Sequence, residues 1–506
     1  MKHGSLVILN REQCYQAVVT RDKRFDGVFF VAVKTTRIYC RPICPSKRPQ
    51  LGHCEFYIHP AAAEAAGFRP CLRCRPELAP GFAPVDANHR LVLAALRKLE
   101  ENSLGETGVG ELAGSLGVTD RHLRRVLRNV LGVTPIQVAQ TQRLLLAKLL
   151  LTDTRLPVID VAYASGFSSL RRFNALFRER YKLAPTKLRR TNHVPAEQSR
   201  CLCTVSYRMP FDWMSLMEFF APRIFDGVER IVDGRYYRTV EIGQRSGWIM
   251  VENKPSQSAL QVEVCPDLLP VLVQVLNRVR RLFDLEAVPE RIVDHLGPIA
   301  SANPGLRVPG AFDGFEMAVR AILGQQISVR AATTLALRLT RRFGKELTTS
   351  VAGLTHLSPT PGALAKAEIS ELTSLGITKS RAASVIALAR AVARQEIVLN
   401  VAVSIEDAIQ KLTQLPGVGE WTAQYFAMRA YGWPDAFPAS DLGILKALKV
   451  KKSKEALEAA EKWRPWRAYA AIHLWKSLEN RRGEVGGERA LRSRNRECRA
   501  PRSGAG

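Results

Sequence analysis

Four cysteines near the start of the chain have the spacing of metal ligands. They stand as Cys40-x3-Cys44 and Cys71-x2-Cys74. Each close pair can supply two sulfurs from one turn, and a tetrahedral zinc site needs four sulfurs in all. The sequence therefore predicts one Zn²⁺ per chain, held by these four side chains. Cys14 and Cys54 match neither pair, and we interpret them as structural thiols.

The residues around these cysteines suit a zinc domain that meets DNA. Residues 29–40 (FFVAVKTTRIYC) are rich in β-branched and aromatic side chains, which predicts a strand leading to the first ligand. Residues 60–67 (PAAAEAAG) are typical of a short helix. Basic side chains, which could contact phosphates, crowd both pairs: Lys34, Arg37, Arg41, Lys47, Arg48, Arg69, Arg73 and Arg75.

A second centre with possible chemistry lies near Asp441. The residues LPGVG at 415–419 precede a predicted helix from Trp421, a pattern typical of a helix-hairpin-helix. Glycines such as Gly417 and Gly419 let the backbone approach closely, so that amide groups can bind a DNA phosphate. Asp441 follows this hairpin within the segment PASDLG, after a loop that contains glycine and proline.

Two similar helical units between residues 85 and 192 could carry arginines into DNA grooves. Thr107 is predicted to cap the first short helix. Thr119 is predicted to cap residues 120–131 after a turn at Gly117, and Ser168 to cap residues 169–181 after a turn at 166–167. A long helix around residues 140–151 joins the units, giving the spacing of a paired helix-turn-helix. The predicted groove contacts are Arg121, Arg124, Arg171 and Arg172.

Composition limits the class of protein that these elements belong to. The chain has 506 residues, with 74 Lys+Arg against 47 Asp+Glu, a net charge of +27. Such an excess points to a polyanion, nucleic acid first and an anionic membrane second. No apolar run is long enough to span a membrane, and no secretory signal is visible, so we expect a cytoplasmic protein with reduced thiols.

The length predicts several domains, and the fold class expected is multidomain and mainly α. A linker is expected at residues 191–200, between an N-terminal half that holds most of the positive charge and a C-terminal half. The predicted units are a small α/β zinc domain (1–80), a paired helix-turn-helix (85–192), a small α/β layer (203–300), an all-α domain (301–480) and a disordered basic tail (481–506).

The zinc segment resembles a known family. TTRIYCRPICPSKRPQ and AAGFRPCLRCRPE are similar to the N-terminal domain of the Ada adaptive-response proteins. The resemblance implies that Cys40, as a zinc-bound thiolate, accepts a methyl group from a methyl phosphotriester in DNA. It also implies DNA contacts by Thr36, Lys47 and Arg69, of which Lys47 stands where the family has an arginine. The alternative interpretation is a purely structural zinc module.

Residues 85–192 resemble the AraC family of transcription regulators. That resemblance implies sequence-specific binding to double-stranded promoter DNA, with RNA polymerase as a partner in transcription activation. The bases that are read do not follow from the sequence. A Pro-Cys-His-Arg motif, which marks a second methyltransferase domain in full-length Ada, does not occur in the chain, so repair of O6-alkylguanine is not expected.

Residues 203–478 resemble the helix-hairpin-helix DNA glycosylases of the AlkA type, through GAFDGFEMAVRAILGQQIS, LPGVGEWTAQYFAMRAYG and KWRPWRAYAAIHLW. The resemblance implies hydrolysis of the N-glycosidic bond of alkylated bases such as 3-methyladenine, at a nucleotide flipped out of the duplex. Asp441 would stabilise an oxocarbenium-like sugar. Trp421, Tyr425 and Trp475 would form a pocket that attracts a cationic base.

Two differences refine this expectation. Bifunctional members carry a lysine where Trp421 stands, so a monofunctional enzyme without lyase activity is expected. Gln326 stands at the position of the intercalating leucine and would fill the gap in the duplex by hydrogen bonding. Two alternatives remain open: a regulator whose glycosylase half is inactive, and a glycosylase whose zinc half only docks on DNA.

Overall fold

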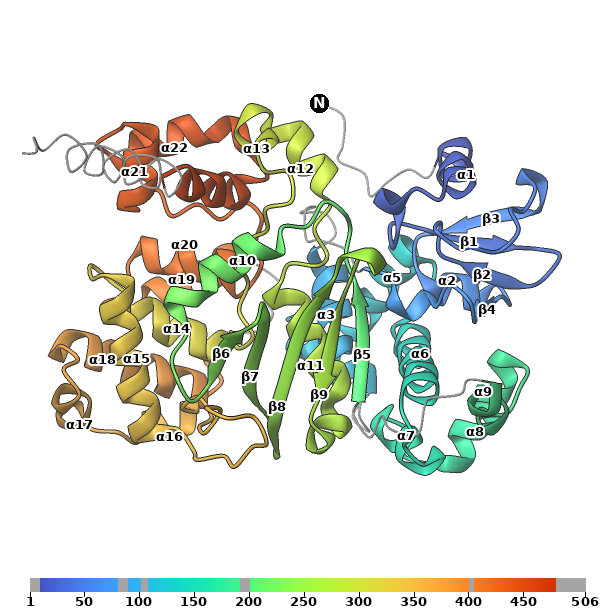
Figure 1. The fold of residues 1–506 in the computed structure, drawn as a ribbon, viewed down its shortest axis with the longest axis horizontal. Helices are drawn as coiled ribbons and strands as arrows, with labels where there is room; N and C mark the ends of the chain where they lie inside the picture. Colours follow the sequence, from blue (N-terminus) through green and yellow to red (C-terminus); the bar gives the residue numbers. More distant parts are fainter. Residues whose placement is uncertain (1–9, 81–89, 102–107, 192–200, 400–404, 479–506) are drawn as a thin grey trace, which may run out of the picture.

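The computed structural model describes residues 10–80, 90–101, 108–191, 201–399 and 405–478. The predicted cap Thr107 and the predicted tail 481–506 lie outside these ranges. The described residues form a multidomain, mainly helical protein with two small sheets, which confirms the predicted fold class. Figure 1 shows the five-stranded sheet in the middle, with N-terminal segments on one side and C-terminal helices on the other. No helix in these ranges is long and apolar enough to span a bilayer.

A four-stranded sheet forms the first unit, with the strand order β3-β1-β2-β4. Its elements are α1 (Arg11–Thr20), β1 (Phe30–Val33), β2 (Ile38–Cys40), β3 (Cys54–Tyr57), α2 (Pro60–Ala65) and β4 (Arg69–Pro70). The prediction of one strand over residues 29–40 is wrong. The chain reverses after Val33, with Arg37 in the left-handed region at φ 54°, and β1 and β2 pair as an antiparallel hairpin.

Among the described residues, seven helices follow this sheet: α3 (Arg90–Glu101), α4 (Gly108–Ser115), α5 (Asp120–Leu131), α6 (Pro135–Asp153), α7 (Val158–Ala164), α8 (Leu170–Tyr181) and α9 (Pro185–Thr191). Thr119 caps α5 as predicted, because its hydroxyl accepts the His122 N–H at 3.3 Å. The predicted cap Ser168 is wrong by one residue. Helix α8 begins at Leu170, so the extended residue before it, Ser169, accepts the Arg172 N–H.

The C-terminal half opens with an antiparallel sheet in the order β5-β9-β8-β7-β6. Its strands are β5 (Cys201–Ser206), β6 (Glu229–Val232), β7 (Arg235–Ile242), β8 (Arg245–Lys254) and β9 (Ala259–Val264). Helices α10 (Trp213–Phe220) and α11 (Leu272–Leu282) share the core of this sheet. Helices α12 (Pro289–Leu296) and α13 (Pro298–Ser301) contribute buried residues to the core of the all-α region instead.

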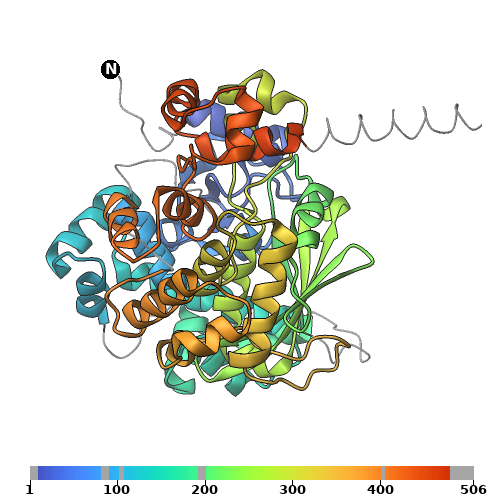
Figure 2. The same cartoon turned by 90° about the vertical axis from the view of Figure 1, so that its left-hand side faces the viewer.

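An all-α region completes the described fold. Its helices are α14 (Gly314–Leu323), α15 (Val329–Phe343), α16 (Pro361–Ala365), α17 (Ile369–Ser374), α18 (Lys379–Ala393), α19 (Ile405–Thr413), α20 (Glu420–Arg429), α21 (Leu442–Leu448), α22 (Ser453–Ala460) and a last helix over residues 467–478. Figure 2, which views this side directly, shows these helices stacked against one another. Helices α14, α18 and α20 pack together around a single apolar core.

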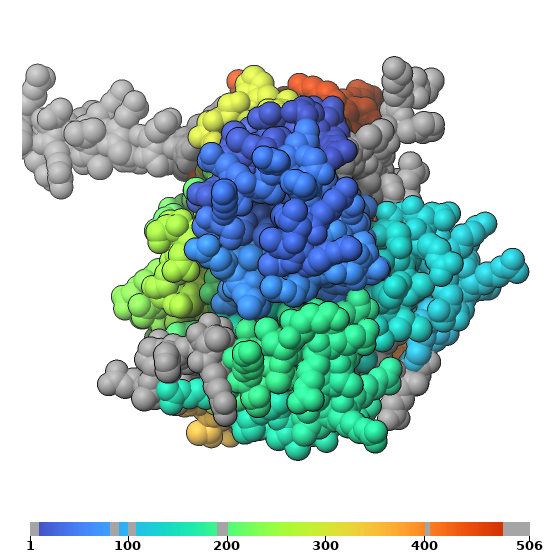
Figure 3. Space-filling model, turned by 90° about the vertical axis from the view of Figure 1, so that its right-hand side faces the viewer, coloured from blue at the N-terminus to red at the C-terminus, as the bar shows by residue number. Residues whose placement is uncertain are grey.

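One hydrophobic core crosses the predicted linker between the two halves. It joins Leu144 and Phe177 of the paired helical units to Val205 and Val262 of the five-stranded sheet. Figure 3 shows the first unit, in blue, lying against the cyan and green surface of the paired helical units. The segments on the two sides of the predicted linker at residues 191–200 therefore share one core.

Two buried cations fasten the first unit to the rest of the chain. Arg208 is 1 % exposed and donates to the backbone carbonyls of Asp26 and Glu286 at 2.9 and 2.7 Å. Lys148 of α6 is fully buried and donates to the Cys71 carbonyl at 3.1 Å and to the Glu77 carboxylate at 2.6 Å. The cysteine-bearing loop thus rests on the helix that joins the two helical units.

Candidate metal centre and base pocket

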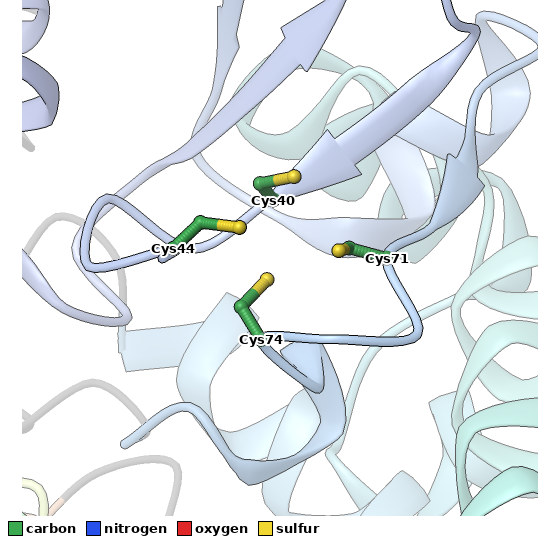
Figure 4. A group of neighbouring side chains, drawn as sticks. All are labelled: Cys40, Cys44, Cys71 and Cys74. Carbon is green, nitrogen blue, oxygen red and sulfur yellow. The ribbon is translucent and has the colours of Figure 1, made fainter. Parts of the chain in front are cut away.

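Parallel pairing of β2 with β4 brings the two cysteine pairs together. Tyr39 lies opposite Pro70, and the Cys71 N–H donates to the Tyr39 carbonyl at 2.9 Å. The next residues along each strand, Cys40 and Cys71, are therefore neighbours. A turn closed by the Cys44 N–H and the Arg41 carbonyl, 3.1 Å apart, folds the third sulfur back toward them. Figure 4 shows the four sulfurs converging on one centre.

The four sulfurs fit a tetrahedral zinc ion. All lie within 4.8 Å of one another. Zinc–sulfur bonds of about 2.3 Å would place the sulfurs about 3.8 Å apart, which small side-chain rotations reach. Within the described ranges, no other cluster of three His, Cys, Asp or Glu side chains has this form. Cys14 and Cys54 are buried outside the cluster, and burial raises the pKa of the Cys14 thiol to about 11.

The four sulfurs differ in the hydrogen bonds that they accept. The Arg41 N–H donates to Cys74 Sγ at 3.3 Å, and the Arg73 N–H donates to Cys71 Sγ at 3.4 Å. Hydrogen bonds from Cys40 first, and also from Ser46, lower the pKa of Cys44 to about 6. Among the described residues, no donor from outside the cluster reaches Cys40 Sγ. A thiolate without such donors keeps more of its nucleophilicity.

A hollow of about 360 Å³ opens beside the cluster. Cys40, Cys44, Thr36 and Lys47 all line it, and the last two are exposed. Arg69, on β4 opposite Ile38, is not part of its lining.

Not all of the basic side chains around the four cysteines are exposed to solvent in this hollow. Arg41 forms a buried ion pair with Asp26, and Arg75 pairs with Glu77 and Asp153 at 3.1 and 2.8 Å. These two arginines, expected among the phosphate-facing cations, are instead tied to internal carboxylates. Lys34 also has a partner, Glu55, at 3.4 Å.

Asp441 stands at the start of α21, where backbone and indole groups converge on its carboxylate. Oδ1 accepts the N–H groups of Gly443 and Ile444 at 2.9 and 3.1 Å. The same oxygen accepts the indole N–H of Trp475 at 2.9 Å, and Oδ2 accepts that of Trp421 at 3.1 Å. The two tryptophans predicted to hold a base therefore also fix the carboxylate, a link for which the sequence carried no signal.

The three predicted aromatic residues lie together in a cavity of about 440 Å³ that Asp441 also lines. Trp421 and Tyr425 stack with ring centroids 5.2 Å apart and planes within 6°, and Trp475 lies 6.2 Å from Tyr425. The cavity is open on one side and is large enough for a purine base.

Arginines complete the wall of this cavity. Arg429 donates to the Tyr425 hydroxyl at 2.6 Å. Burial alone would raise the pKa of Tyr425, but the Arg429 and Arg223 guanidinium groups outweigh it and hold that pKa below its ordinary value. Arg320 lines the same cavity and pairs with Glu316 at 3.1 Å. No local motif marks these arginines, because they come from segments about 200 residues apart.

Two loops border the cavity. Gln326 is exposed, with φ of 54°, at the turn between α14 and α15. Its neighbour Gln325 donates to the Gly417 carbonyl and the Thr422 hydroxyl at 2.8 Å, which fastens this turn to the predicted hairpin. Gly417 has φ of 74°, and a Cβ there would meet Ser384 Oγ at 2.3 Å, so glycine is required. Gly419 caps α20 and is exposed.

The arginines predicted to enter DNA grooves lie on α5 and α8. Arg121, Arg171 and Arg172 are exposed, whereas Arg124 is half-buried and forms an ion pair with Asp120 one turn earlier. The first three can therefore contact a polyanion directly, whereas Arg124 would have to give up its ion pair with Asp120 to bind a phosphate.

Four known domain families match the chain. They are the metal binding domain of Ada (residues 13–77), a helix-turn-helix domain (112–191), the AlkA N-terminal domain (202–313) and the HhH-GPD superfamily base excision DNA repair protein (319–465). The first match and the four-cysteine cluster together show that the chain holds one Zn²⁺, as predicted.

Curated relatives cover the same segments. The chain is 38 % identical over 484 residues to the probable bifunctional transcriptional activator/DNA repair enzyme AlkA of Mycobacterium tuberculosis, covering 93 % of this chain and 97 % of that protein. It is 34 % identical to DNA-3-methyladenine glycosylase 2 of Escherichia coli, over 54 % of this chain and 96 % of that protein. It is 37 % identical to the Ada protein of Escherichia coli, over 25 % of this chain and 34 % of that protein.

Proposed function

The chain belongs to the family of the bifunctional transcriptional activator/DNA repair enzymes AlkA, and from this premise we propose that it both removes alkylated bases and senses alkylated DNA. It is a DNA-3-methyladenine glycosylase with a zinc sensor and a transcription-activating helix-turn-helix. The observation that carries the proposal is the Asp441 carboxylate, held by two indoles at the wall of an aromatic cavity.

Excision follows from the aromatic ring faces and the carboxylate of that cavity. A flipped, alkylated purine is cationic, and the ring faces of Trp421, Tyr425 and Trp475 attract a cation. As the bond between C1′ and the base nitrogen breaks, its electron pair leaves with the base, which becomes neutral. The sugar becomes oxocarbenium-like, and the Asp441 carboxylate stabilises it. Water then adds a hydroxyl group to C1′ and its proton passes to solvent. Trp421 stands where a Schiff-base lysine would act, so no lyase step follows.

The excision proposal has a direct test. A duplex carrying 3-methyladenine is incubated with the full chain, with Asp441→Asn and with Asp267→Asn, which removes an exposed carboxylate elsewhere in the same half. Wild type and Asp267→Asn should release the free base, and Asp441→Asn should release it at least a hundredfold more slowly. Equal release by all three proteins, or no release by wild type, would show that this half is only a DNA-binding module.

The zinc domain acts as a single-use methyl acceptor. Zinc, when bound, keeps the ligating sulfurs deprotonated as thiolates. Cys40 is the sulfur without an outside donor, and it shares its hollow with Thr36 and Lys47, which would position a phosphate. Its attack on the methyl carbon of a phosphotriester forms a thioether and leaves a phosphodiester anion. The transfer also removes one negative charge from the cluster, which strengthens affinity for DNA.

Peptide mass spectrometry tests the acceptor. After exposure to DNA with methyl phosphotriesters, the peptide with Cys40 should gain the mass of one methylene, in wild type and in Cys54→Ser, a buried thiol outside the cluster. Cys40→Ser should gain none. Cys44 is the most exposed of the four ligands, so an adduct on Cys44 would overturn the assignment of Cys40. The absence of any adduct would leave a purely structural zinc module.

The protein binds two kinds of double-stranded DNA, alkylated DNA and promoter DNA. At the promoter it recruits RNA polymerase. The exposed Arg171 and Arg172 of α8 supply groove contacts. A protein with these activities works at the nucleoid, in the cytoplasm. Transcription in vitro should rise when methylated protein is added and should not rise with the double variant Arg171→Ala, Arg172→Ala. An equal rise with that variant would exclude α8 as a groove reader.

A further inference from the structure

Residues 442–454 directly follow Asp441 and carry an unusual set of exposed side chains. Leu442 is 81 % exposed, the highest value among the large hydrophobic side chains of the described residues. An apolar side chain this exposed loses contact with the core and gains nothing from water. Single exposed leucines are ordinary, but this one stands between Asp441 and Gly443, which both line the cavity.

DNA must come close to Leu442 if Asp441 meets C1′ of the flipped nucleotide. Consecutive Cα atoms are about 3.8 Å apart, so a side chain that leaves residue 442 toward solvent lies beside the sugar and phosphate of that nucleotide. Leu442 is therefore an exposed apolar group that can pack against the displaced nucleotide.

A tract of lysines follows Leu442 in this segment. The segment from residue 446 to residue 454 contains five lysines and no acidic residue, and all five are exposed: Lys446, Lys449, Lys451, Lys452 and Lys454. Leu442 and Lys446 are four residues apart, so they share one face of α21, and Lys449 is the residue that ends this helix. Figure 1 places α21 and α22 at the end of the all-α region far from the zinc domain.

The acidic residues nearby do not neutralise the tract. Within the described ranges, no ion pair joins any of the five lysines to a carboxylate. Glu455 follows the tract and turns back to accept the backbone N–H of Lys451 at 3.1 Å, and Glu458 lies further along α22. This half of the chain carries little net charge overall, so a local run of five lysines is a distinct feature of its surface.

We propose that residues 442–454 are a strand-gripping rim, in which the lysines bind phosphates of the damaged strand and Leu442 packs against the sugar of the flipped nucleotide. This inference rests on the proposed excision function, because it takes its direction from Asp441. The rim adds ion contacts to the uncharged amide contacts of the hairpin at Gly417 and Gly419.

Lysine footprinting on the full chain tests the tract without requiring catalysis. The protein, carrying Asp441→Asn, is acetylated with and without a duplex that contains a stable abasic-site analogue, and each lysine is quantified by mass spectrometry. Lys449, Lys451 and Lys452 should lose at least threefold in reactivity when DNA is present. Lys345 and Lys366, exposed in the same half but distant from the cavity, should be unchanged. Equal reactivity of the tract with and without DNA would overturn the rim.

Substitution at Leu442 tests the apolar contact. The measured quantity is the ratio of affinities for the abasic-site duplex and an intact duplex of the same sequence, so that DNA binding by the N-terminal half cancels. Leu442→Ala should lower this ratio about tenfold, Leu442→Met should preserve it, and Ile369→Ala, an exposed apolar residue on α17, should also preserve it. An unchanged ratio in Leu442→Ala would refute the contact.

The outcomes also separate this inference from the proposed function. If wild type does not excise the base but the abasic duplex still protects the lysine tract, the proposed rim stands and the proposed glycosylase activity is refuted. If wild type excises the base but DNA does not protect the lysines, and Leu442→Ala leaves the ratio of affinities unchanged, the glycosylase activity stands and the proposed rim is refuted.

Discussion

Replacing Asp441 by asparagine should harm catalysis and stability through two separable contacts. The carboxylate faces an oxocarbenium-like sugar in the proposed mechanism, and asparagine removes its charge. A unit charge pair about 4 Å apart, at an effective dielectric of about 20, is worth about 4 kcal/mol. That energy corresponds to about a thousandfold in rate. The half-buried position of Asp441 at an open cavity suits this dielectric better than a dry interior.

The stability effect arises at Trp421. An asparagine that keeps the three donors to Oδ1, from Gly443, Ile444 and Trp475, must place its amide NH₂ where Oδ2 stood. The Trp421 indole N–H, 3.1 Å from that atom, would then face another donor. Leaving such a donor without a partner costs about 1–3 kcal/mol.

A double-mutant cycle separates the two effects. Trp421→Phe removes the indole N–H and keeps a ring that can stack on Tyr425, so Trp421→Phe with Asp441→Asn should recover about 1 kcal/mol or more of the loss in unfolding free energy. Base release should stay low in the double variant, because the charge is still missing. Unfolding free energy from denaturant titration and single-turnover base release are the two measurements.

Two results would refute this reasoning. Base release by Asp441→Asn within tenfold of wild type would show that the carboxylate does not stabilise the reacting sugar. Additive losses of unfolding free energy, with no coupling between positions 421 and 441, would show that the indole hydrogen bond does not fix the carboxylate.

Three other predictions follow from buried groups. Removal of zinc should open the four-stranded sheet and raise the number of thiols that react with a thiol reagent, because Cys14 and Cys54 pack in the same small core as the ligands. Lys148→Met should lower the unfolding free energy by about 3 kcal/mol, since it strips a buried ion pair from Glu77, whereas exposed Lys345→Met should change it little; chemical denaturation measures both. Burial lowers the pKa of His473 to about 4, from 6.5. Because only the unfolded state takes up this proton between pH 6.5 and 4, stability should be full above pH 6.5 and fall toward pH 4, and His473→Gln should flatten that slope in thermal melts.

The sequence was a sound guide wherever a short stretch of chain decides the outcome. The two cysteine pairs each lie within one turn, so their spacing alone predicted the zinc ligands that converge in the structure. Thr119 caps α5 because a hydroxyl before a helix reaches only its own first turn. The predicted cap at Ser168 is wrong by one residue, because either of two neighbouring serines could cap the helix. The predicted single strand over residues 29–40 missed one turn, because the same residue types suit one long strand or a hairpin of two short ones.

Contacts between distant segments were decided only by the tertiary structure. The parallel register of β2 and β4 makes Cys40 and Cys71 neighbours, and the packing of three separate helices aims two indoles at Asp441. The shared core across residues 191–200 has the same origin. Ligand types and caps depend on residues a few positions apart, and so the chain sequence alone fixes them. The orientation of a carboxylate and the joining of two halves depend on how whole surfaces pack, and no local pattern encodes that.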